Sequence, residues 1–401
     1  MTNNEDLQAA SQLDRRTVLK SMAATAAVAA LGGLSRTATA ATTINPRWYG
    51  FNLLEYFSTD PDWMKYFPYK DDGRFQEDDF RWIRDWGFNW VRLPMDYRFW
   101  TDPRDMMKID ERKVEPIDRA IRLGEKYSIH VNICLHRAPG ECILDTLDEK
   151  STGIHIEKEK TSVYSDAATA EAFAHQWSFF AKRYKGISNT NLSFNLVNEP
   201  NEPGKSVEVG ASDYARVAKV AIAAIREIDS GRLIISDGYP VGGKPVAELF
   251  ETKVMQSPHD YIPGQVTHYR TPWARPGIDN APVPTWPAKD ANGKVVADKE
   301  TIRKALSPWA DLAAHNIPIH FGEIGCNKYA APEVAYAWFN DTLDLIGELQ
   351  SGWALWNFRG SFGILDTERA GTKFKNWHGH QLDFTLLTML QRKMRNSQGQ
   401  S

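Results

Sequence analysis

Short apolar segments alternate with longer amphipathic segments along most of the chain, from about residue 48 onward. The short segments have the length of buried strands, and the longer ones repeat apolar residues at helical spacing. In the segment 212–228, one apolar stripe is formed by Val217, Val220, Ala221, Ala224, Ile225 and Ile228. This alternation predicts strands and helices that follow one another in turn, which is typical of folds with a parallel sheet.

The pattern predicts eight strands with helices between them. Strands are predicted over 49–53, 90–93, 130–135, 192–198, 233–236, 265–267, 317–322 and 352–356. Helices are predicted over 75–86, 111–127, 167–184, 212–228, 245–252, 300–315 and 332–349. Eight strands that alternate with helices favour an α/β fold with a single (β/α)8 TIM barrel. An open doubly wound sheet is the alternative, and it usually has fewer strands.

Two of the predicted connections are long. One runs over 136–166 and the other over 268–299, and each follows the carboxyl end of a predicted strand. The second contains Trp273, Trp286 and five prolines, at positions 272, 276, 282, 284 and 287. Connections of this length are usually functional or disordered, and the prolines favour an ordered wall beside a cleft. We therefore expect long loops on the C-terminal face of the barrel, where barrel enzymes carry their active sites.

The composition is that of a globular protein. Of the 401 residues, 42% are hydrophobic and 25% are charged, and 48 Lys and Arg residues against 51 Asp and Glu residues give a net charge of −3. This near balance argues against a nucleic-acid partner and against a polybasic membrane surface. Three cysteines, Cys134, Cys142 and Cys326, cannot form a disulfide framework. The 14 tryptophans suit either a sugar-binding cleft or a large core.

Residues 1–40 have the layout of an export signal. Arg15 and Arg16 precede an alanine-rich apolar run over 22–34, and an Ala-Thr-Ala sequence at 38–40 offers a small-residue cleavage site. The arginine pair indicates the twin-arginine pathway, and a Sec signal with a chance arginine pair is the alternative. The run is too short and too rich in alanine for a membrane anchor. We therefore predict a cleaved signal peptide and a location in the periplasm or outside the cell.

Two of the predicted strands end in a carboxylate. Glu199 follows the segment 192–198 within an Asn-Glu-Pro sequence, and Glu323 follows the segment 317–322. These are the fourth and seventh predicted strands, whose ends can face each other across the mouth of a barrel. Cleavage of a glycosidic bond requires such a pair, because one group protonates the leaving oxygen while the other attacks the anomeric carbon or activates water. Two unrelated loop acids are the alternative.

Further polar and aromatic residues fall in or after other predicted strands. Arg92 lies in an apolar strand, and a buried arginine needs a carboxylate partner, so we expect it to bond to Glu323. His136 follows the third strand and is expected either to contact substrate or to support a residue that does. Trp356 ends the eighth strand and can offer its ring face to a sugar. The alternative is that its ring only fills the barrel as a plug.

Taken together and in this order, the motifs from 50–53 to Trp356 resemble glycoside hydrolase family 5, the cellulase-like family of (β/α)8 retaining glycosidases. The resemblance covers essentially all of the chain after residue 40. The roles that it implies are acid/base for Glu199, nucleophile for Glu323, support of the nucleophile for Arg92, a contact to the sugar 2-hydroxyl for Asn198, and substrate binding for His136 and Trp356.

The sixth predicted strand departs from the family's pattern. Members commonly have His, any residue and then Tyr at this place, whereas His268 and Tyr269 are adjacent here. Adjacent side chains of a regular strand point to opposite faces. We expect either a bulge that turns both side chains toward the site or a single residue that keeps the role.

We therefore expect a single catalytic domain over 41–401 that cleaves β-linked glucans, as an endo-β-1,4-glucanase does, by double displacement. A β-mannanase or an exo-acting β-glucosidase is the alternative within the family. A non-catalytic carbohydrate-binding barrel is the alternative outside it, although such a barrel would tend to lose a carboxylate. No metal or cofactor is expected. The expected partner is a β-glycan or oligosaccharide, bound by a monomer without a membrane anchor.

Overall fold

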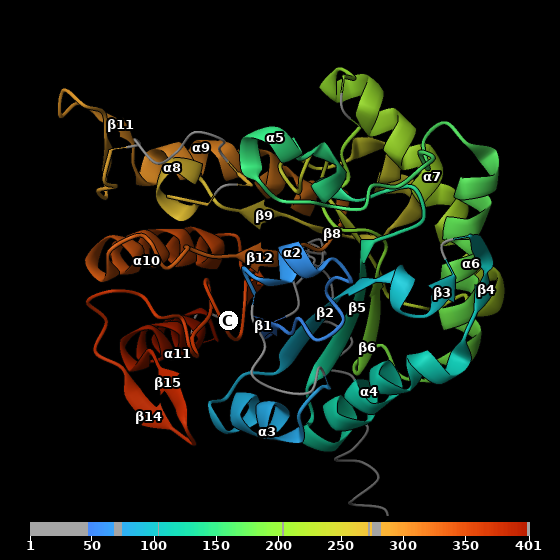
Figure 1. Cartoon of the computed structure of the whole chain (residues 1–401), viewed down its shortest axis with the longest axis horizontal. Helices are drawn as coiled ribbons and strands as arrows, with labels where there is room; N and C mark the ends of the chain where they lie inside the picture. Colours follow the sequence, from blue (N-terminus) through green and yellow to red (C-terminus); the bar gives the residue numbers. More distant parts are fainter. Residues whose placement is uncertain are drawn as a thin grey trace, which may run out of the picture. The chain divides into compact units, whose positions relative to one another are not determined.

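A barrel of parallel strands forms the centre of the fold (Figure 1). Its strands are β1 (Tyr49–Asn52), β2 (Trp90–Asp96), β5 (His130–Arg137), β6 (Leu192–Asn195), β7 (Ile234–Asp237), β8 (Met255–Ser257), β9 (His259–Asp260), β12 (His320–Ile324) and β13 (Gly352–Leu355). They pair in parallel in the order β8-β7-β6-β5-β2-β1-β13-β12-β9. A parallel bridge between Gln256 and Ile319 brings the two ends of the sheet together. The predicted (β/α)8 barrel is confirmed.

This computed structural model describes residues 47–67, 74–102, 104–202, 204–271, 273–274 and 282–398. They all belong to the compact unit Thr43–Ser401. The predicted signal peptide over 1–40 lies outside the described residues. Among the helices that are described, none is both long enough and apolar enough to cross a membrane.

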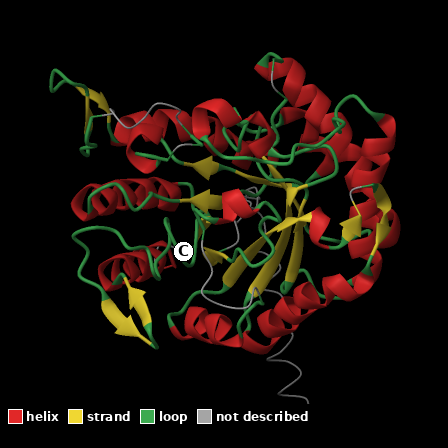
Figure 2. Ribbon diagram, viewed as in Figure 1, coloured by secondary structure: helices red, strands yellow, loops and turns green. Residues whose placement is uncertain are grey.

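Helices surround the barrel on its outside (Figure 2). The long ones are α3 (Glu77–Asp85), α4 (Glu115–Tyr127), α6 (Ala167–Arg183), α7 (Val207–Ile228), α9 (Lys299–Ala310), α10 (Pro332–Glu348) and α11 (Phe384–Gln398). The predicted helix over 245–252 is a 3-10 turn over Ala247–Thr252. Helix α11 follows β13 and packs beside α10, and the sequence pattern did not predict it.

Shorter helices and strands lie in the connections between these elements. They comprise the helices α2 (Pro61–Met64), α5 (Glu149–Thr152) and α8 (Gly264–Thr267) and the antiparallel pairs of β3 (Thr101–Asp102) with β4 (Asp105–Ile109), β10 (Ala288–Lys289) with β11 (Val295–Ala297), and β14 (Lys375–Trp377) with β15 (His380–Leu382). α5 lies in the long connection predicted over 136–166, after β5. α8 follows β9 and ends just before the connection predicted over 268–299, and α2 follows β1.

The sixth barrel strand lies elsewhere than the sequence predicts. The segment 265–267 belongs to the helix α8, so the strand predicted there is wrong. The sixth position is filled by β8 and β9, which are separated by Pro258. This strand escaped detection because its buried residues are mostly polar. Gln256, for example, is fully buried and satisfies both ends of its amide on the backbone of Val246, at 2.8 and 2.9 Å.

The tryptophans divide between the two uses that the sequence left open. Most of the large buried rings belong to the core, namely Trp90, Trp100, Trp177, Trp309, Trp338 and Trp353. Three others, Trp63, Trp273 and Trp356, line a cavity at the carboxyl ends of the strands. The aromatic content therefore serves the core first and the site second.

Candidate active site

The two carboxylates lie at neighbouring points of the barrel mouth. Glu199 follows β6 in a left-handed backbone conformation, with φ of +46°, and its backbone N–H donates to Asp237 Oδ2 at 3.0 Å. Glu323 lies in β12, and 4% of its side chain is exposed against 14% for Glu199. One oxygen of Glu199 and one of Glu323 lie within 4.8 Å of each other. The parallel barrel therefore brings together two acids that are 124 positions apart in the sequence.

Glu323 is held by two donors. Arg92 Nη1 donates to Oε1 at 2.8 Å, which is the ion pair expected from the sequence. The hydroxyl of Tyr261 donates to Oε2 at 2.8 Å. Both oxygens of the carboxylate are thus fixed in direction, and the bond to Arg92 is charge-assisted.

Arg92 is a fully buried hub beneath the site. Its guanidinium donates to four further side chains, which are Asn52 Oδ1 at 3.0 Å, Asn195 Oδ1 at 3.0 Å, Asn198 Oδ1 at 2.8 Å and Cys134 Sγ at 3.1 Å. Asp237 Oδ2 lies 3.5 Å from Nη2. Burial opposes the charge of Arg92, but the surrounding Cys134, Glu323 and Asp237 raise its pKa. The guanidinium therefore stays charged and fixes the orientation of the side chains that accept its hydrogen bonds.

His259 bridges the acids. Its Nδ1 lies 2.9 Å from Glu199 Oε1 and 3.7 Å from Glu323 Oε2, and its Nε2 lies 3.2 Å from Asp237 Oδ2. Burial works against protonation of the imidazole, but the charges of Glu323 and Asp237 outweigh it and raise its pKa to about 10. At neutral pH the ring is therefore an imidazolium that donates to Glu199.

The acid at position 199 is the one inclined to keep its proton. Burial raises the pKa of Glu199, the hydrogen bond from His259 lowers it, and the charge of Glu323 raises it again, with a net upward shift. A carboxyl with a raised pKa beside one held by an arginine has the division of roles that acid catalysis and nucleophilic attack require.

The same three groups are the only set of possible cation ligands found within the described part of the chain. Ligand atoms of Glu199, His259 and Glu323 lie within 4.8 Å of one another. Each of them already has a protein partner, since His259 contacts both acids and Arg92 holds Glu323. The arrangement is balanced by these side chains and requires no cation.

The carboxylates open into a cavity of about 480 Å³. His136 and Trp356 both line it, and their rings stack at 5.6 Å with an interplanar angle of 22°. Burial, above all, holds the pKa of His136 well below its usual range, so its ring is neutral. Asn198 is fully buried next to the site, where its Oδ1 accepts from Arg92 and its Nδ2 finds no hydrogen-bond partner in the described residues. Asn198 is not among the residues that line the cavity, so its contact to a sugar stays a prediction.

His268 and Tyr269 are not residues of the sixth barrel strand. Both follow α8, and only His268 lines the cavity, while Tyr269 is buried and does not. The positions expected for them are taken by His259 and Tyr261, which are spaced as His, any residue, Tyr. The expected bulge in the sixth strand is therefore wrong, whereas one of the two residues, His268, does reach the cavity, from the end of α8 and not from a strand.

The spacing of His259 and Tyr261 was visible in the sequence, and matching it to the family's pattern would have found both residues. Other residues of the site carried no such signal. Asn52, Cys134, Asn195 and Asp237 lie inside predicted strands or directly after one, and only the barrel shows that they surround Arg92.

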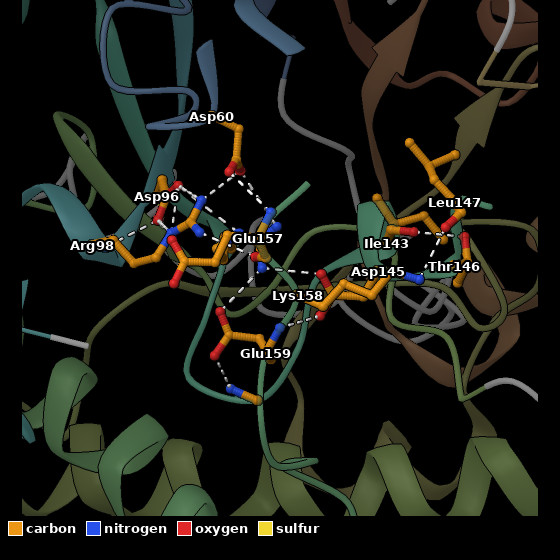
Figure 3. A network of polar contacts seen from close by, with 12 residues as sticks. Asp60, Asp96, Arg98, Ile143, Asp145, Thr146, Leu147, Glu157, Lys158 and Glu159 are labelled. Atoms are coloured by element: carbon orange, nitrogen blue, oxygen red, sulfur yellow. Dashed lines mark hydrogen bonds and ion pairs between the residues drawn. The ribbon is translucent and has the colours of Figure 1, made fainter. Parts of the chain in front are cut away.

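The loop after β5 forms one wall of the cavity through Ile143, Leu144, Thr146 and Leu147. Figure 3 shows the polar contacts that hold it. Arg137, next to His136, donates to Asp145 Oδ1 at 3.1 Å and Glu159 Oε1 at 3.0 Å. Lys158 Nζ donates to the carbonyl of Leu147 at 2.9 Å. The wall is thereby tied to the strand that carries His136.

A (β/α)8 barrel with two carboxylates facing each other at the ends of β6 and β12 defines a glycoside hydrolase. Comparison with known proteins agrees. A family model described as cellulase, glycosyl hydrolase family 5, matches residues 43–361. The chain therefore belongs to glycoside hydrolase family 5, as the resemblance of the motifs indicated.

Individual relatives fit this assignment. Endoglucanase C of Acetivibrio thermocellus is 26% identical over 71% of this chain and 83% of its own length, and cellodextrinase A of Ruminococcus flavefaciens is 25% identical over 67% and 74%. A crystal structure of a glycoside hydrolase superposes with a TM-score of 0.75 and 34% identity over 86% of this chain and 99% of the other. Endoglucanase Cel5A of Thermotoga maritima has the same fold, with a TM-score of 0.63 and 22% identity over 86% and 97%.

Proposed function

We propose that this protein hydrolyses β-1,4-linked glucan with retention of the anomeric configuration. The observation that carries the proposal is the spacing of the two carboxylates. Oxygens of Glu199 and Glu323 lie within 4.8 Å of each other. Retaining enzymes hold their carboxyl groups about 5–5.5 Å apart, whereas inverting enzymes leave about 6.5–9.5 Å for a water molecule. The names of the endoglucanase and cellodextrinase relatives support glucan as the substrate.

In the first step, Glu323 Oε2 or Oε1 attacks the anomeric carbon while Glu199 gives its proton to the leaving oxygen. The bond from carbon to the leaving oxygen breaks as the ester bond to Glu323 forms. Arg92 and Tyr261 hold the attacking carboxylate in place, which removes the cost of orienting it. In the second step, Glu199 takes a proton from water, and the water oxygen replaces Glu323 on the anomeric carbon.

The proposal is tested by release of reducing sugar from carboxymethyl cellulose, mixed-linkage glucan, laminarin, glucomannan and xylan. Glu323→Ala should lose nearly all turnover. Glu199→Ala should lose about 10²–10⁴-fold on these polymers, because their leaving groups need a proton. Its loss should be much smaller on an aryl glycoside with an acidic leaving group. Glu208→Ala, at an exposed position of α7, is the matched control and should retain full activity.

The stereochemistry can be followed directly by proton NMR of the first product. Retention gives the β-anomer first, and its appearance before mutarotation agrees with the proposal. Initial release of the α-anomer would refute double displacement. Activity on xylan or mannan in the absence of glucan hydrolysis would refute the substrate assignment but leave the mechanism standing.

We also propose that the protein is exported by the twin-arginine pathway, loses residues 1–40, and acts as a monomer without a membrane anchor. The arginine pair and the Ala-Thr-Ala sequence at 38–40 support this proposal. N-terminal sequencing of exported protein should start at Ala41, and the mass in solution should be that of one chain.

A further inference from the structure

The turn that carries Glu199 has an uncommon backbone conformation. Glu199 has φ of +46°, in the left-handed region that residues other than glycine rarely adopt. Such a conformation persists only where the surrounding contacts impose it. The turn over 198–202 belongs to no helix or strand, so its buried backbone N–H groups need partners outside regular secondary structure. The acceptors of these N–H groups are therefore what holds the turn, and with it the acid, in place.

Each of the four backbone N–H groups in the turn donates to an acceptor outside it, and the fifth residue, Pro200, has no N–H. The four bonds run from Asn198 to the carbonyl of Leu135 at 2.9 Å, from Glu199 to Asp237 Oδ2 at 3.0 Å, from Asn201 to Glu141 Oε1 at 3.3 Å, and from Glu202 to the hydroxyl of Tyr239 at 3.1 Å. Three of these acceptors are side chains. They lie at or just after the ends of β5 and β7, the two strands that flank β6 in the barrel.

Glu141 is held rigidly in the loop after β5. Its backbone N–H donates to the carbonyl of Ala138 at 3.1 Å, and its own carbonyl accepts from the N–H of Ala138 at 2.9 Å. Gly140, with φ of +71°, is packed so closely that a Cβ there would lie 2.3 Å from Thr169 Cγ2. Glu141 itself is 5% exposed and is not among the residues that line the catalytic cavity. Its side chain therefore acts on the turn and not directly on the substrate.

We propose that Glu141 and Tyr239 are positioning residues for acid catalysis, because their side chains hold the turn that aims the carboxyl of Glu199 at the leaving oxygen. The proposal rests on the proposed function, because it takes Glu199 as the acid. Glu141 and Tyr239 each fix one N–H beyond Glu199, and Asp237 fixes the N–H of Glu199 itself. Without one of these acceptors the turn relaxes, and the carboxyl of Glu199 no longer has a single fixed position.

The carboxyl of Glu141 accepts as a neutral group. Burial, above all, raises its pKa to about 8, so at neutral pH most of it carries a proton. Its Oε1 then resembles the carbonyl oxygen of a glutamine. Glu141→Gln keeps this acceptor, whereas Glu141→Met keeps the length of the side chain and removes the acceptor. Tyr239→Phe removes only the hydroxyl that accepts from Glu202.

Two aryl β-cellobiosides test the proposal, one with dinitrophenol and one with phenol as the leaving group. Their kcat/KM reports the steps up to the glycosyl-enzyme, in which phenol needs a proton from Glu199 far more than dinitrophenol does. With phenol, Glu141→Met and Tyr239→Phe should each lose about 10–100-fold, since a misplacement of about 1 Å can cost that much. With dinitrophenol, both should lose about threefold or less, because little acid catalysis is at stake. Glu141→Gln should resemble the wild type on both substrates.

Glu171→Met makes the same change at an exposed position of α6 and is the matched control, which should behave like the wild type. A cooperative urea transition for each variant confirms that it is folded. Where Glu141→Met fails this check, Tyr239→Phe and Glu141→Gln carry the test. A variant that loses equally on the two substrates, or on neither, overturns the positioning role of its residue. A loss in Glu141→Gln as large as that in Glu141→Met also overturns it, because the accepting oxygen is then not what matters.

Glu199→Ala distinguishes failure of this proposal from failure of the proposed function. It should show the same dependence on the leaving group, with a larger loss on the phenol substrate. If it loses by the same factor on both substrates, Glu199 is not the acid, and the proposed function fails. If the wild type cleaves neither cellobioside and no polymer of the glucan panel, the proposed function fails as well.

Discussion

The substitution Arg92→Lys tests how far the site depends on one guanidinium. Arg92 donates to five side-chain acceptors, on Asn52, Cys134, Asn195, Asn198 and Glu323. A lysine ammonium has three donors and no fork geometry, so at least two of these buried acceptors lose their partner. A buried group left without its hydrogen bond costs about 1–3 kcal/mol. We therefore expect the free energy of unfolding to decrease by about 2–6 kcal/mol although the charge is kept.

Arg92→Met removes the charge as well. It leaves Glu323 and Asp237 opposed only by His259, and loss of one partner of a buried ion pair costs about 3–5 kcal/mol. The double variant Arg92→Met/Glu323→Gln isolates the cost of leaving the carboxylate of Glu323 unpaired, because a neutral side chain at position 323 no longer needs the cation. The loss caused by Arg92→Met should be smaller in the Glu323→Gln background by about 0.5–3 kcal/mol.

The assay is urea-induced unfolding at pH 7, followed by tryptophan fluorescence, together with kcat/KM on a soluble glucan. Arg112→Lys is the control, because Arg112 pairs with Asp110 at the surface with 90% of its side chain exposed, and it should not change the unfolding midpoint. An Arg92→Lys variant that unfolds at the same urea concentration as the wild type, with the same m-value, would refute the reasoning.

Three further changes concern His259 in the site, the buried acid Glu141, and the N-terminus. His259→Gln removes the cation whose hydrogen bond lowers the pKa of Glu199, so the alkaline limb of kcat/KM should move to higher pH while the maximum falls. An unmoved limb would contradict the assignment of Glu199 as the acid. Burial raises the pKa of Glu141 from its usual 4.5 to about 8, so the folded state keeps a proton that the unfolded state releases, and stability decreases as the pH rises through this interval. Glu141→Gln should flatten that part of a pH series of urea midpoints, and an equal slope in both proteins would contradict it. Replacement of Arg15 and Arg16 by lysine should retain the protein in the cytoplasm, as judged by fractionation, and unchanged export would favour a Sec signal.

The sequence predicted those parts of the site that follow an apolar strand. Glu199 and Glu323 both end segments rich in buried apolar residues, which are Leu192, Phe194, Leu196 and Val197 before the first and Ile317, Ile319 and Phe321 before the second. Hydrophobic patterning therefore located the strands, and the strand ends located the acids. Arg92 was recognisable because a charge within an apolar strand needs a partner. In each case a local pattern was enough, since the barrel topology then brought the strand ends together.

The parts that were missed depend on polar residues that are satisfied only in the folded protein. The strand with His259 has Gln256, Ser257 and Asp260 as buried residues, and their partners come from distant segments or from the turn that follows. Hydrophobic patterning cannot detect such a strand. It selected 265–267 instead because that segment contains the apolar Val266, which the structure buries within α8. The misplaced strand then led to His268 and Tyr269. One of them still lines the cavity, because α8 follows directly on the true strand.

In the proposed mechanism, the charges at the centre of the site also explain why Glu199 can serve both steps. Arg92 and His259 supply two positive charges, and Asp237 and Glu323 supply two negative charges while Glu199 holds its proton. When Glu323 becomes an ester, its negative charge disappears, and with it one of the interactions that raise the pKa of Glu199. Glu199 can then remain ionised opposite His259, which is the state needed to accept a proton from water. The buried cluster has equal positive and negative charge before and after this exchange, so neither step leaves an uncompensated charge in the low-dielectric interior.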